Sequence, residues 1–196
     1  MTSYQDLLDF WFADLATPAK AMKLWFTADP ELDATLQTRF GGLLAEAEAG
    51  GLRDWETNPD GLLALVVLLD QFSRNCHRGS GKAFANDERA RILAQRARAA
   101  GWDQAMLPLE RLFLYLPFEH SEDLADQELS VSLFAELQKV APPEQNAIFA
   151  GIYDYALRHR DVIARFGRFP HRNERLGRTS TPVELSFLAE PGSSFG

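Results

Sequence analysis

Proline recurs where α-helices are expected to begin, and this punctuation constrains the fold more than any other feature of the chain. A proline at the first helical position loses nothing through its missing N–H, and its fixed φ suits a helix start. Asp29, Asn58 and Thr181 can cap three of these helices, and Thr181 with Glu184 forms a capping box. Five prolines fit this position: Pro30, Pro59, Pro108, Pro143 and Pro182. The expected helix ends carry glycines: Gly50, Gly51, Gly79, Gly101 and Gly167.

Together with hydrophobic periodicity, this punctuation predicts the positions of the helices. They cover residues 3–12, 30–49, 59–77, 86–100, 108–117, 121–140, 143–166 and 182–190. No stretch shows the sustained alternation that is typical of a set of strands. We therefore predict an all-α fold, with residues 1–196 forming a single helical domain. It would be an antiparallel array of about eight helices joined by short loops.

The predicted helix over residues 59–77 is the most apolar. Residues 62–69 are apolar on every side, so this helix should lie at the centre of the molecule. Asp70 and Arg74 follow, four residues apart, and charges at such depth must be paired because their desolvation costs several kcal/mol. A structural ion pair is the favoured interpretation. Gln71 and Asn75 lie nearby and could line a polar cavity.

The charge balance excludes some classes of partner. Lys and Arg total 20 against 28 Asp and Glu, which gives a net charge of -8. Such a field repels phosphate backbones and anionic membranes, so neither nucleic acid nor a membrane is an expected partner. Cys76 is the only cysteine, which fits a reducing compartment. Because the chain shows neither a signal peptide nor a membrane-spanning run, we expect a cytoplasmic protein.

An acidic turn, Glu119-His120-Ser121-Glu122-Asp123, carries the first candidate chemistry. Ser121 can cap the following helix, and the two acids after it would complement the helix dipole in its first turn. Capping accounts for these three residues without any function. It does not account for His120, which a neighbouring carboxylate could make a general acid or base.

A basic loop over residues 165–178 carries the second. Its five arginines against one glutamate give a local charge of +4 in an acidic chain. Arginine forks bind carboxylate and phosphate groups, so Arg168, Arg172 and Arg178 could hold an anion beside His171 and Asn173. The competing interpretation is that the loop docks onto the protein's own acidic segment. Internal docking is favoured, and it is compatible with ligand binding if one or two arginines are left over.

His159 lies on the buried stripe of the helix over residues 143–166, so it should point inward. An inward histidine is more often a satisfied core residue than a ligand, unless it meets His120 or His171. No metal-binding spacing, phosphate-binding loop or dinucleotide fingerprint is present. The sequence therefore predicts neither a metal nor a cofactor.

Four stretches carry a family resemblance: LLDQFSRN (68–75), PFEHSED (117–123), RFGRFPHRN (165–173) and LGRTST (176–181). With Phe10-Trp11-Phe12 and Trp25-Phe26, they resemble the bacterial family known as domain of unknown function 924 over nearly the whole chain. The resemblance implies an all-α fold similar to tetratricopeptide-like right-handed helical arrays, and no established activity. Ser73 departs from the family pattern, which usually has proline there.

These observations favour a small-molecule site between the 117–123 turn and the 165–178 loop, and two histidines are its candidate catalytic residues. His120 or His171 would move a proton, and the ligand would be a small anion. The expected ligand-binding residues are Arg168, Arg172, Asn173, Arg178, Glu122, His159, Asp70 and Arg74.

The alternative is a helical interaction module for a peptide or protein partner, which a groove lined by exposed Trp11, Trp25 or Trp55 would favour. In a third interpretation the motifs form ion pairs and hydrogen bonds that hold the C-terminal loop to the helices, and Phe195 of the C-terminal tail docks in an apolar slot. The small-molecule hypothesis requires that the basic loop folds over the acidic turn and leaves a polar hollow between them.

Overall fold

The computed structural model describes residues 2–15 and 17–193. Within these residues the regular elements are α-helices, short 3₁₀ helices and one π turn, and no strand occurs. This confirms the all-α class. Phe195, expected to dock, lies outside the described residues. The α-helices are α1 (Tyr4–Trp11), α2 (Pro18–Phe26), α3 (Pro30–Glu48), α4 (Pro59–Val67), α5 (Ser73–Cys76), α6 (Asp87–Ala99), α7 (Pro108–Glu119), α8 (Leu124–Val140), α9 (Asn146–Phe166) and α10 (Pro182–Leu188).

Side-chain caps explain the starts of several helices. Asp29, Asn58 and Thr181 each accept a backbone hydrogen bond as N-caps, and the capping box of Thr181 and Glu184 is formed. The sequence prediction missed α2, although Pro18 is at a first helical position like the other prolines. The predicted start of the 121–140 helix was wrong, because Asp123 is the cap and α8 begins at Leu124.

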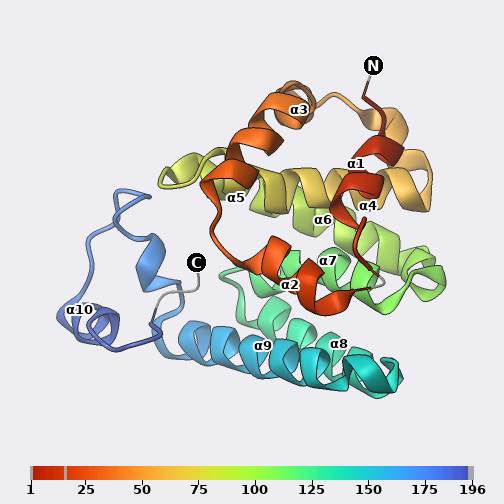
Figure 1. The fold of residues 1–196 in the computed structure, drawn as a ribbon. Coiled ribbons are helices and arrows are strands. Elements are labelled where there is room, and N and C mark those ends of the chain that lie inside the picture. The colour runs from red at the N-terminus through yellow and green to blue at the C-terminus, as the bar shows by residue number, and fades with distance from the viewer. Residues whose placement is uncertain (1, 16, 194–196) are drawn as a thin grey trace.

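The central helical rod runs through α4, a π turn over Leu68–Phe72 and α5 (Figure 1). Its apolar part, residues 62–69, is at most 2% exposed. The rod packs against α1, α3, α6 and α7, which explains why it is apolar on every side. A regular α-helix was expected over 59–77, but the backbone hydrogen bonds change from i→i+4 to i→i+5 in the turn that contains Asp70. Such π turns are rare in proteins, and those that occur are often at functional sites.

A second layer lies below this rod in Figure 1, where α8 runs along α9 and also packs on α7. Edge-to-face aromatic contacts fill the core above it, with Trp25 and Phe113 ring centroids 4.7 Å apart. The C-terminal segment, residues 167–193, stands at one end of α9 (Figure 1). Phe169 of this segment packs with Val162 and Ile163 of α9 in a small cluster separate from the main core. In the described part of the chain, no helix is both long and apolar enough to cross a membrane.

Candidate functional site

Asp70 lies in the π turn and is completely buried. Its Oδ1 atom is 2.7 Å from His120 Nδ1 and 3.2 Å from Arg74 Nη1, and its Oδ2 accepts a 2.6 Å hydrogen bond from the amide of Gln71. Burial alone would raise the pKa of Asp70. The positive charge of Arg74 and the contacts with His120 and Gln71 outweigh that effect and hold the pKa well below its usual range. Asp70 is therefore a permanent anion inside the core.

His120 is the C-cap of α7, and the structure places it between Asp70 and the surface. Burial lowers the pKa of His120, and the nearby charge of Arg74 lowers it further despite the attraction of Asp70. A neutral imidazole whose Nδ1–H donates a hydrogen bond to a carboxylate carries its lone pair on Nε2. The ring is thus held in the tautomer that can accept a proton on the side away from Asp70.

A chain of alternating charges leads outward from this pair. Arg74 donates to both oxygens of Asp87, at 2.9 and 3.1 Å, and Asp87 accepts a further 3.1 Å bond from Arg172 Nη1. No sequence pattern distinguishes Asp87, because the first turn of a helix commonly carries an acid. Its role depends on two arginines far away in sequence.

Arg172 ends this chain in an unusual environment for a guanidinium. It is 6% exposed and lies 4.6 Å from the ring centroid of Phe84 and 4.5 Å from that of Phe169. Burial lowers the pKa of Arg172 to about 10, against the attraction of Asp87. Among the described residues its Nε has no hydrogen-bond partner. Arg172 therefore has one carboxylate contact and donor capacity to spare.

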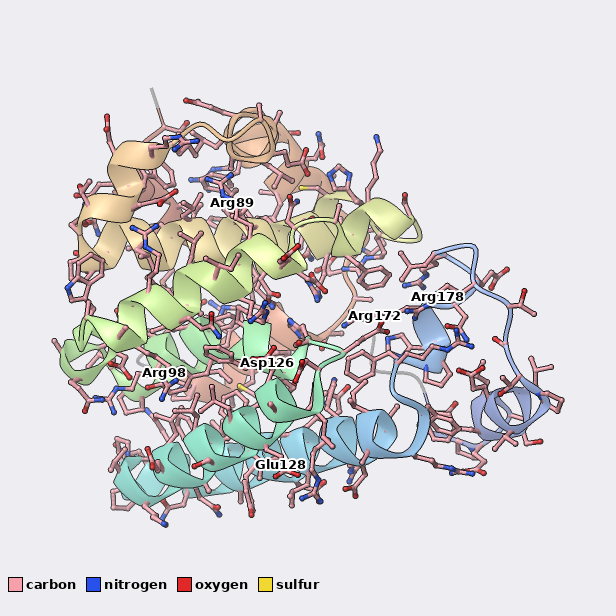
Figure 2. All side chains as sticks on the ribbon, turned by 180° about the vertical axis from the view of Figure 1, so that it is seen from behind. Arg89, Arg98, Asp126, Glu128, Arg172 and Arg178 are labelled. Carbon is pink, nitrogen blue, oxygen red and sulfur yellow. The ribbon has the colours of Figure 1, made fainter. Side chains whose placement is uncertain are left out.

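Glu122 and Arg178 join the acidic turn to the basic loop. Arg178 donates to both oxygens of Glu122, at 2.6 and 2.9 Å, and Glu122 also accepts a 2.8 Å bond from the backbone N–H of Phe169. Burial raises the pKa of Glu122, but the bonds from Arg178 and Phe169 lower it overall. Figure 2 shows Arg172 and Arg178 on the C-terminal segment where it meets the helices. The basic loop thus lies over the acidic turn.

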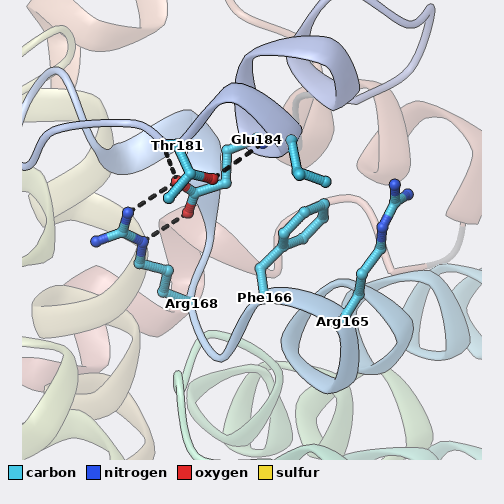
Figure 3. Close-up of a pocket in the computed structure, with 6 residues that line it drawn as sticks. Arg165, Phe166, Arg168, Thr181 and Glu184 are labelled. Atoms are coloured by element: carbon cyan, nitrogen blue, oxygen red, sulfur yellow. Dashed lines mark hydrogen bonds and ion pairs between the residues drawn. The ribbon is translucent and has the colours of Figure 1, made fainter.

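Two other candidates serve the C-terminal segment itself. Arg168 donates to both oxygens of Glu184, at 2.6 and 2.8 Å (Figure 3). It also donates to the carbonyl of Thr179. Asn173 is buried and donates to Ser180 Oγ at 3.0 Å. An open hollow of about 520 Å³ beside Arg168 contains neither histidine nor the Asp70 cluster. These contacts fold the segment on itself.

His159 is buried, as expected from its place on the inner stripe of α9. Its Nδ1 is 3.0 Å from the carbonyl of Tyr155, and its ring centroid is 5.5 Å from that of Phe169. Burial lowers the pKa of His159 well below the usual value. The ring centroid of His171 also lies 5.5 Å from that of Phe169. Burial, together with the nearby charge of Arg172, lowers the pKa of His171 to about 3. Both histidines are neutral parts of the packing around Phe169.

Glu119 was not distinguished from the other acids of its turn in the sequence analysis. Glu119 is 2% exposed, and its Oε1 lies 3.6 Å from His159 Nδ1. That nitrogen is closer to the carbonyl of Tyr155, at 3.0 Å. Among the described residues the Oε2 of Glu119 has no hydrogen-bond partner. Burial, reinforced by the negative charge of Asp70, raises the pKa of Glu119 to about 8. Only its position at the end of an otherwise buried helix could have signalled this.

A cleft of about 410 Å³ opens between α6, the acidic turn and the basic loop. Of the predicted site residues, His120, Glu122 and Arg172 line it, while Asp70 and Arg74 lie behind His120 and Asp87. His159, His171, Arg168, Asn173 and Arg178 are not among its lining residues. Within the described residues, no group of three or more His, Cys, Asp or Glu side chains is arranged to hold a metal ion.

The profile of a family of bacterial proteins of unknown function, DUF924, matches residues 7–192. The chain belongs to the DUF924 family. This member is also similar to a solved structure, the protein of unknown function ATU0120 from Agrobacterium tumefaciens. The two are 38% identical with a TM-score of 0.80, and the match covers 95% of this chain and 96% of that one. Among curated proteins none matches. The assignment confirms the resemblance noted from the sequence.

Proposed function

We propose that the cleft between the acidic turn and the basic loop binds a small molecule carrying a carboxylate or phosphate group. The observation that carries this proposal is Arg172, which lines the cleft while it is nine-tenths buried and bound to a single carboxylate. Burial lowers the pKa of Arg172 to about 10, because the attraction of Asp87 does not fully offset the loss of hydration. An anion in the cleft would give the accessible part of this guanidinium a second negative partner, and guanidinium groups favour paired N–H···O bonds to such anions.

We further propose that His120 is the general base of this site. Asp70 orients the ring through the 2.7 Å contact at Nδ1, and Arg74 keeps the imidazole neutral, so that Nε2 can accept a proton from a bound molecule. Such an orienting carboxylate fixes the tautomer in many acid–base sites. His171, the other catalytic candidate, does not line the cleft, so the proton-transfer role goes to His120.

The remaining candidates support the walls of the site. Arg178 and Glu122 hold the basic loop against the acidic turn. Arg168 and Asn173 shape the C-terminal segment, and His159 packs beneath Phe169. In this proposal they act through the shape of the cleft instead of touching the ligand.

A tetratricopeptide-like superhelix serving as a protein interaction module is the alternative. It would be favoured by exposed tryptophans along a groove, but Trp11 and Trp25 are 1% and 6% exposed, and Trp55 is partly buried against the core. That distribution supports the small-molecule site instead.

A cytoplasmic location is also part of the proposal. Cys76 is consistent with it, since burial raises the pKa of this thiol to about 11 and leaves it unreactive.

Calorimetric titration of the protein with succinate and with inorganic phosphate, at constant ionic strength, tests the proposed site. The wild type should bind at least one of them, and Arg172→Lys should weaken binding by about tenfold or more because a lysine cannot form the paired bonds. Arg158→Lys, an exposed arginine on α9, is the matched control and should bind like the wild type. If neither anion binds, or if Arg172→Lys binds as tightly as the control, the proposal fails.

A further inference from the structure

The wall of the cleft formed by α6 carries a carboxylate that the internal network does not use. Asp87 and Glu88 are neighbours at the start of α6 and both line the cleft. Asp87 is occupied by Arg74 and Arg172. Glu88 is exposed, and within the described part of the chain it makes no side-chain hydrogen bond or ion pair, although Arg91 lies one turn along the same wall. Its oxygens are therefore open to the cleft.

The basic loop contributes the guanidinium of Arg172 to the same cleft, where its carboxylate contact among the described residues is Asp87. The Nε of Arg172 lacks a partner within the described residues, and the guanidinium is stacked between Phe84 and Phe169 so that it cannot swing into solvent to be hydrated. The cleft thus has one positive pole that is rigid and desolvated, and one negative pole that is free. The two poles come from different elements, the 3₁₀ turn Pro170–Arg172 and α6.

A simple anion is poorly matched to this lining. Three carboxylates line the cleft, but Asp87 is paired with Arg74 and Arg172, and Glu122 is paired with Arg178. Among the described residues, Glu88 is the carboxylate of this lining that has no ion-pair partner. The whole chain carries a net charge of -8. A ligand with only negative charge would be attracted at Arg172 but repelled by Glu88 and by the overall field. A ligand with a positive group at its other end would relieve that repulsion.

We propose that the ligand of this cleft is a zwitterion, a small metabolite that carries an amino group beside its carboxylate or phosphate group. The anionic group binds Arg172 and the amino group binds Glu88. This inference rests on the proposed function and goes beyond it by naming the ligand class and a specificity residue. The cleft volume of about 410 Å³ lies within the range of metabolite sites. An ammonium group also offers a proton to His120, which lines the same cleft.

Matched pairs of ligands that differ only by an amino group test this inference: succinate against aspartate, propionate against β-alanine, and ethyl phosphate against phosphoethanolamine. Affinities are measured by calorimetry at constant ionic strength for the wild type, Glu88→Gln and Glu136→Gln. Glu136 is an exposed residue of α8 away from the cleft, so its substitution controls for the change in net charge. Circular dichroism confirms that each variant is folded.

In at least one pair, the wild type should bind the amino compound about tenfold more tightly than its partner. Glu88→Gln should abolish that preference while leaving the affinity for the simple anion unchanged or higher, and Glu136→Gln should keep it. If simple anions bind as well as their amino counterparts, or if the preference survives in Glu88→Gln, the zwitterion inference is overturned while the anion site stands. If no member of any pair binds, both proposals fall together.

Discussion

His120 Nδ1 and Asp70 Oδ1 are 2.7 Å apart, although fifty positions separate these residues in the sequence. The contact joins the π turn of the central rod to the C-terminal end of α7. Because Asp70 is fully buried, its charge is tolerated only while its partners remain in place. The same contact that stabilises the core therefore orients the imidazole beside the cleft.

Replacing His120 separates the structural part of this contact from the chemical part. His120→Ala should lower the free energy of unfolding by about 2–3 kcal/mol, because Asp70 loses a hydrogen-bond partner in the core. His120→Asn can keep a donor near the position of Nδ1 and should lose about half as much or less. Urea denaturation at neutral pH measures both. Equal losses in the two variants would show that the hydrogen bond to Asp70 contributes little.

Glu119 should make the protein less stable as the pH rises toward 8. Its pKa is raised from the ordinary 4.5 to about 8 in the folded state, so the folded protein binds a proton that the unfolded chain has released. Stability from this group is fully present below about pH 4.5, and it is lost as the pH rises through the folded pKa. The buried histidines, whose pKa values are lowered, are neutral in the folded state, whereas in the unfolded chain each is about a quarter protonated at pH 7 and only about 3% protonated at pH 8. They therefore add an opposite slope that fades across this interval.

Glu119→Gln therefore removes most of the decline in stability between about pH 7 and 8. Urea denaturation of the wild type and the variant at half-unit pH intervals measures the slope. Glu136→Gln is the control, since this exposed acid should leave the wild-type profile unchanged. A wild-type profile that is flat over this interval, or a decline that persists in Glu119→Gln, would show that Glu119 is ionised in the folded protein.

The helices were largely predictable because their signals are local. A cap such as Thr181, with Glu184 three residues later, fixes a helix start through contacts within one turn. At α2 the signal is the proline at the first helical position alone, since Thr17 makes no side-chain cap, and the sequence prediction does not include this helix. The sequence predicts Ser121 as a cap, but Asp123 two residues later performs that role. Adjacent capping residues compete, and sequence spacing alone does not decide between them.

The candidate site was only partly predictable, since its contacts are not local. The acidic turn and the basic loop were expected to meet because opposite charges attract, and Glu122 does pair with Arg178. The partner of Arg172, however, is Asp87 from α6, which no sequence pattern links to the basic loop. Likewise, the π turn at Asp70 depends on how the central rod packs. Neither feature leaves a local signature in the chain.

A double-mutant cycle measures how much the ion pair of Glu122 and Arg178 contributes to the free energy of unfolding. Glu122→Gln, Arg178→Met and the double variant should give a coupling energy of about 1–2 kcal/mol, because the pair is bidentate and partly buried. Each single variant should also increase hydrogen exchange in residues 168–178, which this pair holds against α7 and α8. A coupling energy near zero would mean that the loop is held by its apolar contacts instead.

Gly81 controls how closely the basic loop approaches the cleft. A Cβ at this position would lie 2.6 Å from the backbone carbonyl oxygen of Arg175, so Gly81→Ala must push the loop away from the 3₁₀ turn Gly81–Phe84. Because Phe84 is one of the two rings around Arg172, the displacement should disturb the guanidinium as well.

We expect Gly81→Ala to lower the free energy of unfolding by about 1–3 kcal/mol and to weaken anion binding in the calorimetric titration. Gly151→Ala is the matched control. Gly151 lies inside α9 with no atom within 4 Å of the added Cβ, so alanine there should be neutral or stabilising. If Gly81→Ala is as stable as Gly151→Ala, the loop can retreat without cost. If it also binds anions like the wild type, the stack of Phe84 on Arg172 does not shape the cleft.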